Sequence, residues 1–311
     1  MSRTIFVTAA TGSLGKPLAL ELLKIGWKVR TTTRDPSSPA AQELAKAGVE
    51  VFKGNWDDDE VLRTGMSGCD GLFMNLMPDF TDFTADVRQG RKILSIAKSF
   101  PSIKHVIFSS SVGPSRPELM DYYNPESIIA HFLKNKKIVE DATKDAGFKA
   151  WTILRPTGFM ANWLAPKVAF CFSGIAETGT WTTPLDPDTK MAFIDERDAA
   201  QFAIAAFKDP DRFNGKEIVV SSVLVPVEEV IQIVRRATGK DLKVNYLPEK
   251  EALKMAREEN NWMMESQVTA KSMSKFVDMD EVKGWGIPLH SLEDYLEREK
   301  KSVEKTYGHL S

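Results

Sequence analysis

The chain has 311 residues, of which 42% are hydrophobic and 27% are charged, and its formal net charge is -2. A chain of this size can bury the core of one large domain or of two closely associated lobes. The balanced charge leaves no excess of cations for phosphates, so we expect no nucleic-acid partner. Two cysteines, Cys69 and Cys171, are too few for a disulfide framework and wrongly spaced for a metal site. They predict a reducing compartment and no metal.

The chain begins with the apolar run "TIFVTAATG" at residues 4–12. The run is too short to span a membrane, and it lacks the charged leader and the longer apolar stretch of a signal peptide. We therefore expect a cytoplasmic protein without a membrane partner.

Six β-rich runs alternate with helical patterns in the first half of the chain. The runs typical of strands are residues 4–9, 28–33, 49–54, 71–76, 104–110 and 150–155. Apolar residues recur at three- and four-residue spacing in residues 14–26, 38–48, 59–66, 83–100 and 130–147, as in amphipathic helices. Regular β–α alternation predicts a Rossmann-type fold, in which a doubly wound parallel sheet carries helices on both faces.

The pattern loosens after residue 156. A Gly-, Thr- and Pro-containing stretch, residues 173–190, is followed by a helix, a strand and a helix. We predict a dinucleotide-binding domain at residues 1–155 and a smaller α+β substrate lobe at residues 156–311, with some chain crossing back to the sheet. The charged segment 292–308 is expected to be a helix with a solvated face.

A glycine-rich turn follows the first predicted strand. Its spacing is Ala9-x-x-Gly12-x-x-Gly15, and it lies between a strand and a helix that leads to a second strand. In that context backbone amides at the helix N-terminus can bind a pyrophosphate. The alternative is that Gly12 and Gly15 serve only a tight turn and close helix packing. Ala9 replaces the usual first glycine, which costs little if its φ is negative and is strained if φ is positive.

The end of the second strand distinguishes between the two nicotinamide cofactors. Thr33 and Arg34 end the strand, and Asp35 follows. A guanidinium can pair with a 2′-phosphate, whereas an acid would bind a ribose hydroxyl. Asp35 can instead serve the turn before Pro36. We therefore favour NADP(H) over NAD(H), with a solvated surface charge as the alternative role of Arg34.

Several segments together resemble the NmrA-like branch of the atypical short-chain dehydrogenase/reductase superfamily. They are "TAATGSLG", "GNWDDDEVL", "HVIFSSSVG", "ILRPTGFMANW" and "MAFIDERDAAQFAIAAFKDPDRFNGKEI", within residues 4–250. The resemblance implies a Rossmann sheet with a small C-terminal substrate lobe. Many members of the family are fungal reductases, and some are redox-sensing regulators without known turnover.

The resemblance also implies a set of cofactor-binding positions. The pyrophosphate would lie at the turn, the 2′-phosphate at Arg34, the adenine beside Asn55, Trp56 and Asp57, and the nicotinamide ribose along residues 75–77. Besides Asp57, the expected set is Thr8, Ala10, Thr11, Gly12, Ser13, Leu14, Gly15, Arg34, Asn55, Trp56, Asn75, Leu76, Met77, Lys136 and Pro156.

The catalytic helix departs from the superfamily's Tyr-x-x-x-Lys pattern. In "AHFLKNKKIVE", Phe132 occupies the tyrosine position and Lys136 the lysine position. Phenylalanine cannot donate a proton, so the standard acid is absent there. Lys136 could hold the ribose hydroxyls or the nicotinamide amide, or it could be one of several lysines on a solvated helix face.

Four residues could replace the missing acid. His131 titrates near neutrality, Tyr122 and Tyr123 lie in the loop before the helix, and Ser110 ends the fifth predicted strand. Each has a structural alternative. His131 could face away from the site on its helix, Tyr122 and Tyr123 could pack in a lid, and Ser110 could cap the strand end. Nothing around Ser110 resembles a nucleophile elbow, which disfavours hydrolase chemistry.

An electrophilic acceptor such as an iminium ion or a quinone methide needs little help from an acid. Candidates for an aromatic cleft are Phe159, Met160, Trp163, Trp181, Trp262, Met263 and Met264, although such residues often form core instead. We expect an NADP(H)-dependent oxidoreductase, monomeric or homodimeric, acting on a bulky aromatic or polycyclic small molecule in secondary metabolism. The alternatives are a non-turnover NADP(H) sensor and a non-redox cyclase or isomerase that retains the cofactor.

Overall fold

The structure is a computed structural model that describes residues 2–121, 123–258 and 261–311. The chain divides into two compact units with interleaved segments. The first unit comprises Met1–Ser111, Phe132–Pro156 and Ala199–Ile218, and the second comprises Val112–His131, Thr157–Asp198 and Val219–Ser311.

A seven-stranded sheet organises the first unit. Its strand order is β10-β6-β5-β4-β1-β2-β3. The neighbouring pairs from β6 to β3 are parallel, and the order reverses between β1 and β4. The strands are β1 (Thr4–Val7), β2 (Lys28–Thr33), β3 (Glu50–Lys53), β4 (Gly71–Asn75), β5 (His105–Ser109), β6 (Ala150–Pro156) and β10 (Lys216–Val220). The predicted Rossmann-type parallel sheet is confirmed.

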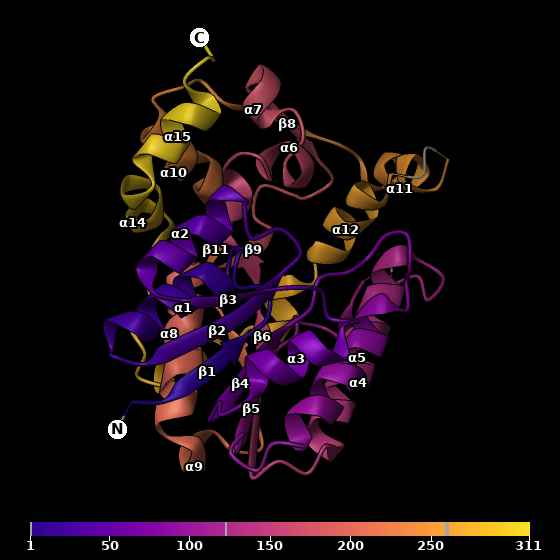
Figure 1. Ribbon diagram of the computed structural model, residues 1–311. Coiled ribbons are helices and arrows are strands. Elements are labelled where there is room, and N and C mark those ends of the chain that lie inside the picture. The colour runs from indigo at the N-terminus through magenta and orange to yellow at the C-terminus, as the bar shows by residue number, and fades with distance from the viewer. Residues whose placement is uncertain (1, 122, 259–260) are drawn as a thin grey trace. The chain divides into compact units, whose positions relative to one another are not determined.

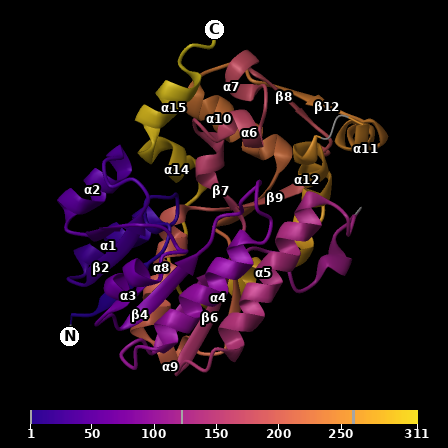
Figure 2. The same ribbon diagram turned by 45° about the vertical axis from the view of Figure 1, so that its right-hand side comes forward.

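Helices cover both faces of this sheet. Figures 1 and 2 show α1 and α2 on one side and α3, α4 and α5 on the other. The helices are α1 (Gly15–Lys24), α2 (Pro39–Ala47), α3 (Asp59–Met66), α4 (Ala85–Lys98), α5 (Ile128–Asp145), α8 (Glu196–Lys208) and α9 (Pro210–Phe213). Each of the first five coincides with a predicted helix to within two residues at either end.

The burial pattern explains this arrangement. All five residues of β5 and the first four of β4 are buried, as expected for strands covered on both faces. Apolar side chains from α3, α4 and α5 form a cluster with those of the central strands, and the cluster includes Phe6, Leu62, Ile93 and Val139. The first strand and the glycine turn are therefore held on a rigid layer.

The second unit contains two small sheets and a group of helices. One sheet has the order β11-β9-β7, and β12 pairs with β8. The elements are β7 (Gly158–Phe159), β8 (Thr180–Thr183), β9 (Lys190–Ile194), β11 (Val223–Pro226), β12 (Lys243–Tyr246), α6 (Val168–Cys171), α7 (Ile175–Thr178), α10 (Val227–Thr238), α11 (Glu249–Glu258), α12 (Trp262–Ala270), α13 (Met279–Gly284), α14 (Leu292–Arg298) and α15 (Lys300–Tyr307), with 3-10 turns at Pro117–Leu119, Met160–Trp163 and Met273–Phe276.

The segment 292–308, predicted as a helix with a solvated face, consists of two helices, α14 and α15. Most of their charged residues are exposed, Arg298 and Glu299 are half-buried, and Leu292, Tyr295, Leu296, Val303 and Tyr307 are buried in the core of the second unit. These two helices therefore contribute to the core of the second unit as well as to its surface.

No helix in the described part of the chain is both long and apolar enough to cross a membrane.

Candidate functional site

The ends of β1 and β4 are joined at the point where the strand order reverses. The fully buried Thr8 donates its hydroxyl proton to the Asn75 carbonyl at 2.7 Å, and its Oγ1 accepts the Asn75 N–H at 2.7 Å. In open α/β sheets ligands bind beyond the carboxyl ends of the strands at such a reversal. Thr8 and Asn75 are therefore part of the floor of this edge.

The turn after β1 is tight and contains one strained residue. Ala9 has φ of +50°, in the left-handed region that glycine adopts without a steric cost. The Gly12 N–H donates to the Ala9 carbonyl at 2.9 Å. A Cβ on Gly15 would lie 2.3 Å from that carbonyl oxygen, so only glycine fits there. The positive φ shows that the alanine in place of the first glycine costs conformational energy.

The N-terminus of α1 opens toward this turn. Its N-cap, Leu14, provides no side-chain cap, and its first turn contains no acidic residue. The positive end of the helix dipole is therefore not compensated by a carboxylate of the helix itself, and Thr11 and Ser13 add hydroxyls on the turn. These features suit an anion at the helix N-terminus.

The end of β2 presents Arg34 to solvent. Its neighbour Asp35 closes the turn before α2, since its Oδ1 accepts the Ser37 N–H at 2.9 Å and the Ser37 hydroxyl at 2.5 Å. The hydrogen bond from the Ser37 hydroxyl is the main cause that lowers the pKa of Asp35. Asp35 thus has the turn role that we considered for it, and the guanidinium is the group available to a ligand.

The expected adenine-side segment follows β3. Asn55 is exposed, and Trp56 is half-buried against the core. The Asp57 carboxylate accepts hydrogen bonds from Arg88 and, at 2.9 Å, from Gln89, so it anchors this loop to α4.

Lys136 reaches the end of β4 from α5. Its Nζ donates to the Leu76 carbonyl at 3.2 Å and lies 5.4 Å from the centre of the Phe108 ring. Burial lowers the pKa of Lys136 to about 8, although the negative charges of Asp86 and Glu140 raise it. Lys136 is therefore directed into the sheet edge rather than onto a solvated helix face.

Asp86 was not singled out in the sequence. It is 4% exposed, in the first turn of α4, and its Oδ1 accepts a hydrogen bond from Asn135 Nδ2 at 2.8 Å. The same amide donates to the Phe83 carbonyl at 2.6 Å. Burial raises the pKa of Asp86. An acid on the apolar face of a helix, in register with Gly90 and Ile93, is the pattern that could have identified it.

Phe132 lies one helical turn before Lys136 and contacts two other aromatic rings. The Phe80 ring meets it edge-on at 5.3 Å, and the Phe83 ring lies 6.0 Å away. Phe80 is 50% exposed and Phe83 40%. We call Phe80, Phe83 and Phe132 the aromatic trio. The trio forms a partly exposed aromatic surface at the position where the Tyr-x-x-x-Lys pattern of the short-chain dehydrogenase/reductase superfamily has the tyrosine.

The remaining acid candidates differ in position. Ser110 follows β5, is 5% exposed, and its Oγ has no hydrogen-bond partner within the described part of the chain. Tyr123 and His131 are half-buried and belong to the second unit. Tyr122 lies outside the described residues. Ser110 and Lys136 thus belong to the same unit. The catalytic roles of the acid candidates Ser110, Tyr122, Tyr123 and His131 remain predictions.

Most candidates for an aromatic cleft belong to the core of the second unit. Trp163 and Trp181 are fully buried, and Phe172 stacks on Trp163 at 3.8 Å. Met160 and Met264 are buried as well, and Phe159 and Met263 are half-buried. Trp262, in contrast, lines a cavity of about 320 Å³.

Arg257, Leu253, Ile128 and Glu265 line that same cavity in the second unit. Its wall combines an indole, aliphatic side chains and charges of both signs, which suits a ligand with an aromatic body and polar groups. Residues 259–260, shortly before Trp262 in the sequence, lie outside the described residues.

A buried acidic group in the second unit has partners of its own. Asp195, Asp198 and His290 place ligand-type atoms within 4.8 Å of one another. Arg298 binds both oxygens of Asp195, at 2.6 and 3.0 Å, and Ser222 and His290 bind Asp198 at 2.5 and 2.6 Å. Because the carboxylates already have these partners, the group is best described as a structural clamp.

The NmrA-like family model matches residues 1–300, so this chain belongs to the NmrA-like family. Among the curated relatives, an NmrA-like oxidoreductase of Aspergillus hancockii is 29% identical over 76% of this chain and 73% of its own length. The oxidoreductase FrzB of a Cladobotryum species is 30% identical over 80% of this chain and 76% of its own. The predicted resemblance is confirmed, and the relatives place the chain in an oxidoreductase family.

Solved structures share the whole fold. NmrA, a negative transcriptional regulator, matches with TM-score 0.73 and 20% identity over 99% of this chain and 98% of its own. The triphenylmethane reductase of a Citrobacter species matches with TM-score 0.73 and 20% identity over 96% and 99%. An NADPH-dependent quinone oxidoreductase of Escherichia coli matches with TM-score 0.70 and 19% identity over 95% and 99%. NmrA is solved with NAD and with NADP, with which the predicted NADP(H) is consistent.

Proposed function

We propose that this protein is an NADP(H)-dependent oxidoreductase that reduces a bulky aromatic or polycyclic small molecule. The first unit would bind the cofactor and the second unit would bind much of the substrate. The observation that carries the proposal is the position of Lys136, whose ammonium lies 3.2 Å from the Leu76 carbonyl at the strand-order reversal.

The residues of this edge suit a dinucleotide. The open N-terminus of α1 would hold the pyrophosphate, and Gly15 lets the helix approach the strand closely. The exposed Arg34 would pair with a 2′-phosphate, and the positions around Asn75 and Pro156 would border the nicotinamide ribose. When bound, the cofactor would supply or accept the hydride.

The side chains near Lys136 suggest how a proton could be managed without a tyrosine. Phe132 has no proton to give, whereas a Lys136 ammonium with a pKa of about 8 is protonated in most molecules at neutral pH. The Ser110 hydroxyl, which has no hydrogen-bond partner among the residues that the structure describes, could orient a substrate oxygen. We propose that Lys136 holds the proton at this edge and that the aromatic trio excludes water from it.

Two observations favour an aromatic substrate. The aromatic trio is partly exposed in the first unit, and Trp262 lines a cavity in the second. Two neighbours of the same fold are a triphenylmethane reductase and a quinone oxidoreductase, whose names refer to triphenylmethane compounds, which carry aromatic rings, and to quinones, which become aromatic on reduction. Fungal oxidoreductase relatives support a role in secondary metabolism, and two unpaired cysteines support a cytoplasmic location.

The test is an assay with NADPH and a panel of quinones, triphenylmethane dyes, enones and imines. We expect loss of absorbance at the nicotinamide band with at least one aromatic acceptor. Lys136→Ala should reduce kcat/KM by about 100-fold, in the range found for proton-transfer groups. Lys137→Ala, on the same helix but paired with Asp141 at 2.5 Å, is the matched control and should retain activity.

A second candidate is a non-turnover NADP(H) sensor. Phe132 in place of the acid and the similarity to a transcriptional regulator favour it. In that case the protein would bind NADPH with an affinity dependent on Arg34, and no acceptor in the panel would consume it. Binding without consumption would therefore contradict the oxidoreductase proposal and support the sensor.

A further inference from the structure

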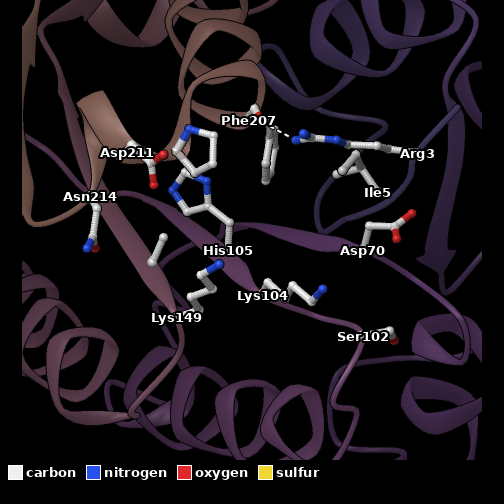
Figure 3. Close-up of a pocket in the computed structure, with 12 residues that line it drawn as sticks. Arg3, Ile5, Asp70, Ser102, Lys104, His105, Lys149, Phe207, Asp211 and Asn214 are labelled. Carbon is white, nitrogen blue, oxygen red and sulfur yellow. Dashed lines mark hydrogen bonds between the residues drawn. The ribbon is translucent and has the colours of Figure 1, made fainter. Parts of the chain in front are cut away.

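We propose that a cavity at the amino-terminal edge of the sheet binds a small carboxylic acid that carries an amino or hydroxyl group on its second carbon. The cavity, of about 240 Å³, lies in the first unit, at the sheet edge opposite to the glycine turn. Figure 3 shows its lining, which includes residues just before or at the start of β1, β5 and β6. This site is independent of the proposed cofactor chemistry.

The cavity lining has more cations than acids. Arg3, Lys104 and Lys149 line it together with Asp70 and Asp211. The Asp70 carboxylate accepts the Thr4 N–H at 2.7 Å, and the Arg3 guanidinium donates to the Phe207 carbonyl. An anion is therefore attracted to the lining, but a doubly charged one is repelled by the two acids. A single carboxylate fits this balance.

Two of the cations are available to that carboxylate. Lys104 and Lys149 precede the first residues of β5 and β6, which are paired neighbours in the sheet. Neither ammonium has an ion-pair partner within the described residues. Two ammonium groups beside one opening can each donate a charge-assisted hydrogen bond to a carboxylate oxygen.

The imidazole of His105 adds a buried hydrogen-bond acceptor. Thr152 donates its only hydroxyl proton to the Phe213 carbonyl at 2.9 Å. The 2.9 Å contact between Thr152 Oγ1 and His105 Nε2 therefore places a proton on Nε2. Burial lowers the pKa of His105 to about 4, so the ring is neutral and Nδ1 carries a lone pair.

That lone pair is unsatisfied. His105 is 5% exposed, and its Nδ1 has no hydrogen-bond partner among the described residues. A buried acceptor without a donor costs about 1–3 kcal/mol. An amino or hydroxyl group next to the ligand's carboxylate would supply that donor, and Asp211 offers a second acceptor for an ammonium.

Apolar residues limit the size of the ligand. Ile5 and Phe207 are each 1% exposed, and the Phe207 ring meets the His105 ring edge-on at 5.5 Å. A Cβ on Gly71, at the start of β4, would lie 2.8 Å from the Phe207 ring. The Phe207 ring is therefore packed closely against this strand. The cavity thus suits a short aliphatic acid rather than a nucleotide or a polymer.

The test compares three acids of matched shape by calorimetry on the full-length protein, with and without NADPH. Leucine and 2-hydroxy-4-methylpentanoate should bind, and 4-methylpentanoate, which lacks the second donor, should bind about tenfold more weakly. In ¹⁵N spectra, leucine should shift the His105 Nδ1 resonance of one of the four histidines. Equal binding of all three acids, an unchanged Nδ1 resonance, or binding of inorganic phosphate alone would overturn the proposal.

A second experiment removes the positive charges of the two lysines. Lys149→Met and Lys104→Met should each weaken the binding of leucine by about tenfold, because each removes a charge-assisted hydrogen bond. Lys46→Met removes the same charge from an exposed position on α2 and is the matched control. Unaltered leucine affinity in the Lys104→Met/Lys149→Met double variant would refute the site. NADPH affinity, measured in the same preparations, tests the cofactor site separately.

Discussion

Three single residues at or near the carboxyl edge of the sheet have an unusual conformation or environment. Ala9 is held at a positive φ by the turn, Lys136 is held in a partly desolvated position, and Asp86 places a buried negative charge near it. Each departs from what its residue type prefers. Such departures gather at functional sites because the surrounding fold compensates for their cost.

Ala9→Gly is expected to stabilise the protein. Glycine adopts a φ of +50° without the clash of a Cβ, so we predict a gain of about 1 kcal/mol in the free energy of unfolding. Urea denaturation measures it. Ala10→Gly, at a buried neighbour whose φ is not positive, is the control and should lose about 1 kcal/mol. Equal losses in both variants would contradict the strain at Ala9.

Lys136, under the electrostatic influence of Asp86, should set a pH dependence. Above pH 8 the ammonium loses its proton, so a step that needs the proton should slow as pH rises through about 8. Asp86→Asn removes a charge that favours the ammonium and should move this alkaline limb down by about one pH unit. Asp141→Asn, which removes the partner of Lys137, should leave it in place.

Profiles of kcat/KM against pH measure the shift. An alkaline limb that stays in place in Asp86→Asn would show that the limb does not belong to Lys136. The sign for stability is opposite to that for activity: the folded pKa of Lys136 lies below its ordinary value of 10.5. The unfolded chain then binds more protons between about pH 8 and 10.5, and the contribution of this group to stability rises with pH over that range.

At the scale of elements, the cofactor selectivity should depend on what each strand presents at its carboxyl end. β2 ends with Thr33, and Arg34 follows it into solvent while Asp35 closes the turn. The same strand begins with the exposed Lys28, at the opposite edge of the sheet. Because all the pairings from β6 to β3 are parallel, only the carboxyl-end residue can approach a ligand at the glycine turn.

Arg34→Ala is therefore expected to weaken the binding of NADPH by about 10- to 100-fold and that of NADH by less than about threefold. The reason is that only NADPH carries the 2′-phosphate. Equilibrium titration of both nucleotides measures the difference. Lys28→Ala should change neither affinity. If Arg34→Ala weakens both nucleotides alike, the guanidinium does not select the phosphate.

At the scale of the whole molecule, both units are assembled from separated segments. The first takes three segments of the chain and the second takes the three between and after them. Within the second unit, Arg298 at the end of α14 ties this helix to the fully buried Asp195, which follows β9, through two hydrogen bonds. Long-range ties of this kind hold distant segments in one unit.

Arg298→Met should destabilise the protein by about 3 kcal/mol, because it leaves the buried Asp195 charge without its partner. Chemical denaturation measures the loss. Arg236→Met removes an exposed pair with Glu293 and should cost less than about 1 kcal/mol. Similar losses in the two variants would show that burial does not decide the strength of the Asp195 contact.

Local patterns in the sequence determined the first half of the fold. Strands such as residues 28–33 and helices such as 59–66 have the predicted bounds, because alternating buried runs and amphipathic periodicity are properties of neighbouring residues. The glycine turn, the absent phenol at Phe132 and the exposed Arg34 are equally local. These features are enough to specify a Rossmann sheet and the family.

Tertiary structure alone decided which side chains meet. The sequence could not give the φ of Ala9, the burial of Asp86 or the lack of a partner for His105 Nδ1 among the described residues, because each depends on residues far away along the chain. The same holds for α14 and α15, whose charged sequence gave no sign of their contribution to the core. Periodicity reports one face of an element, whereas burial depends on what that face packs against.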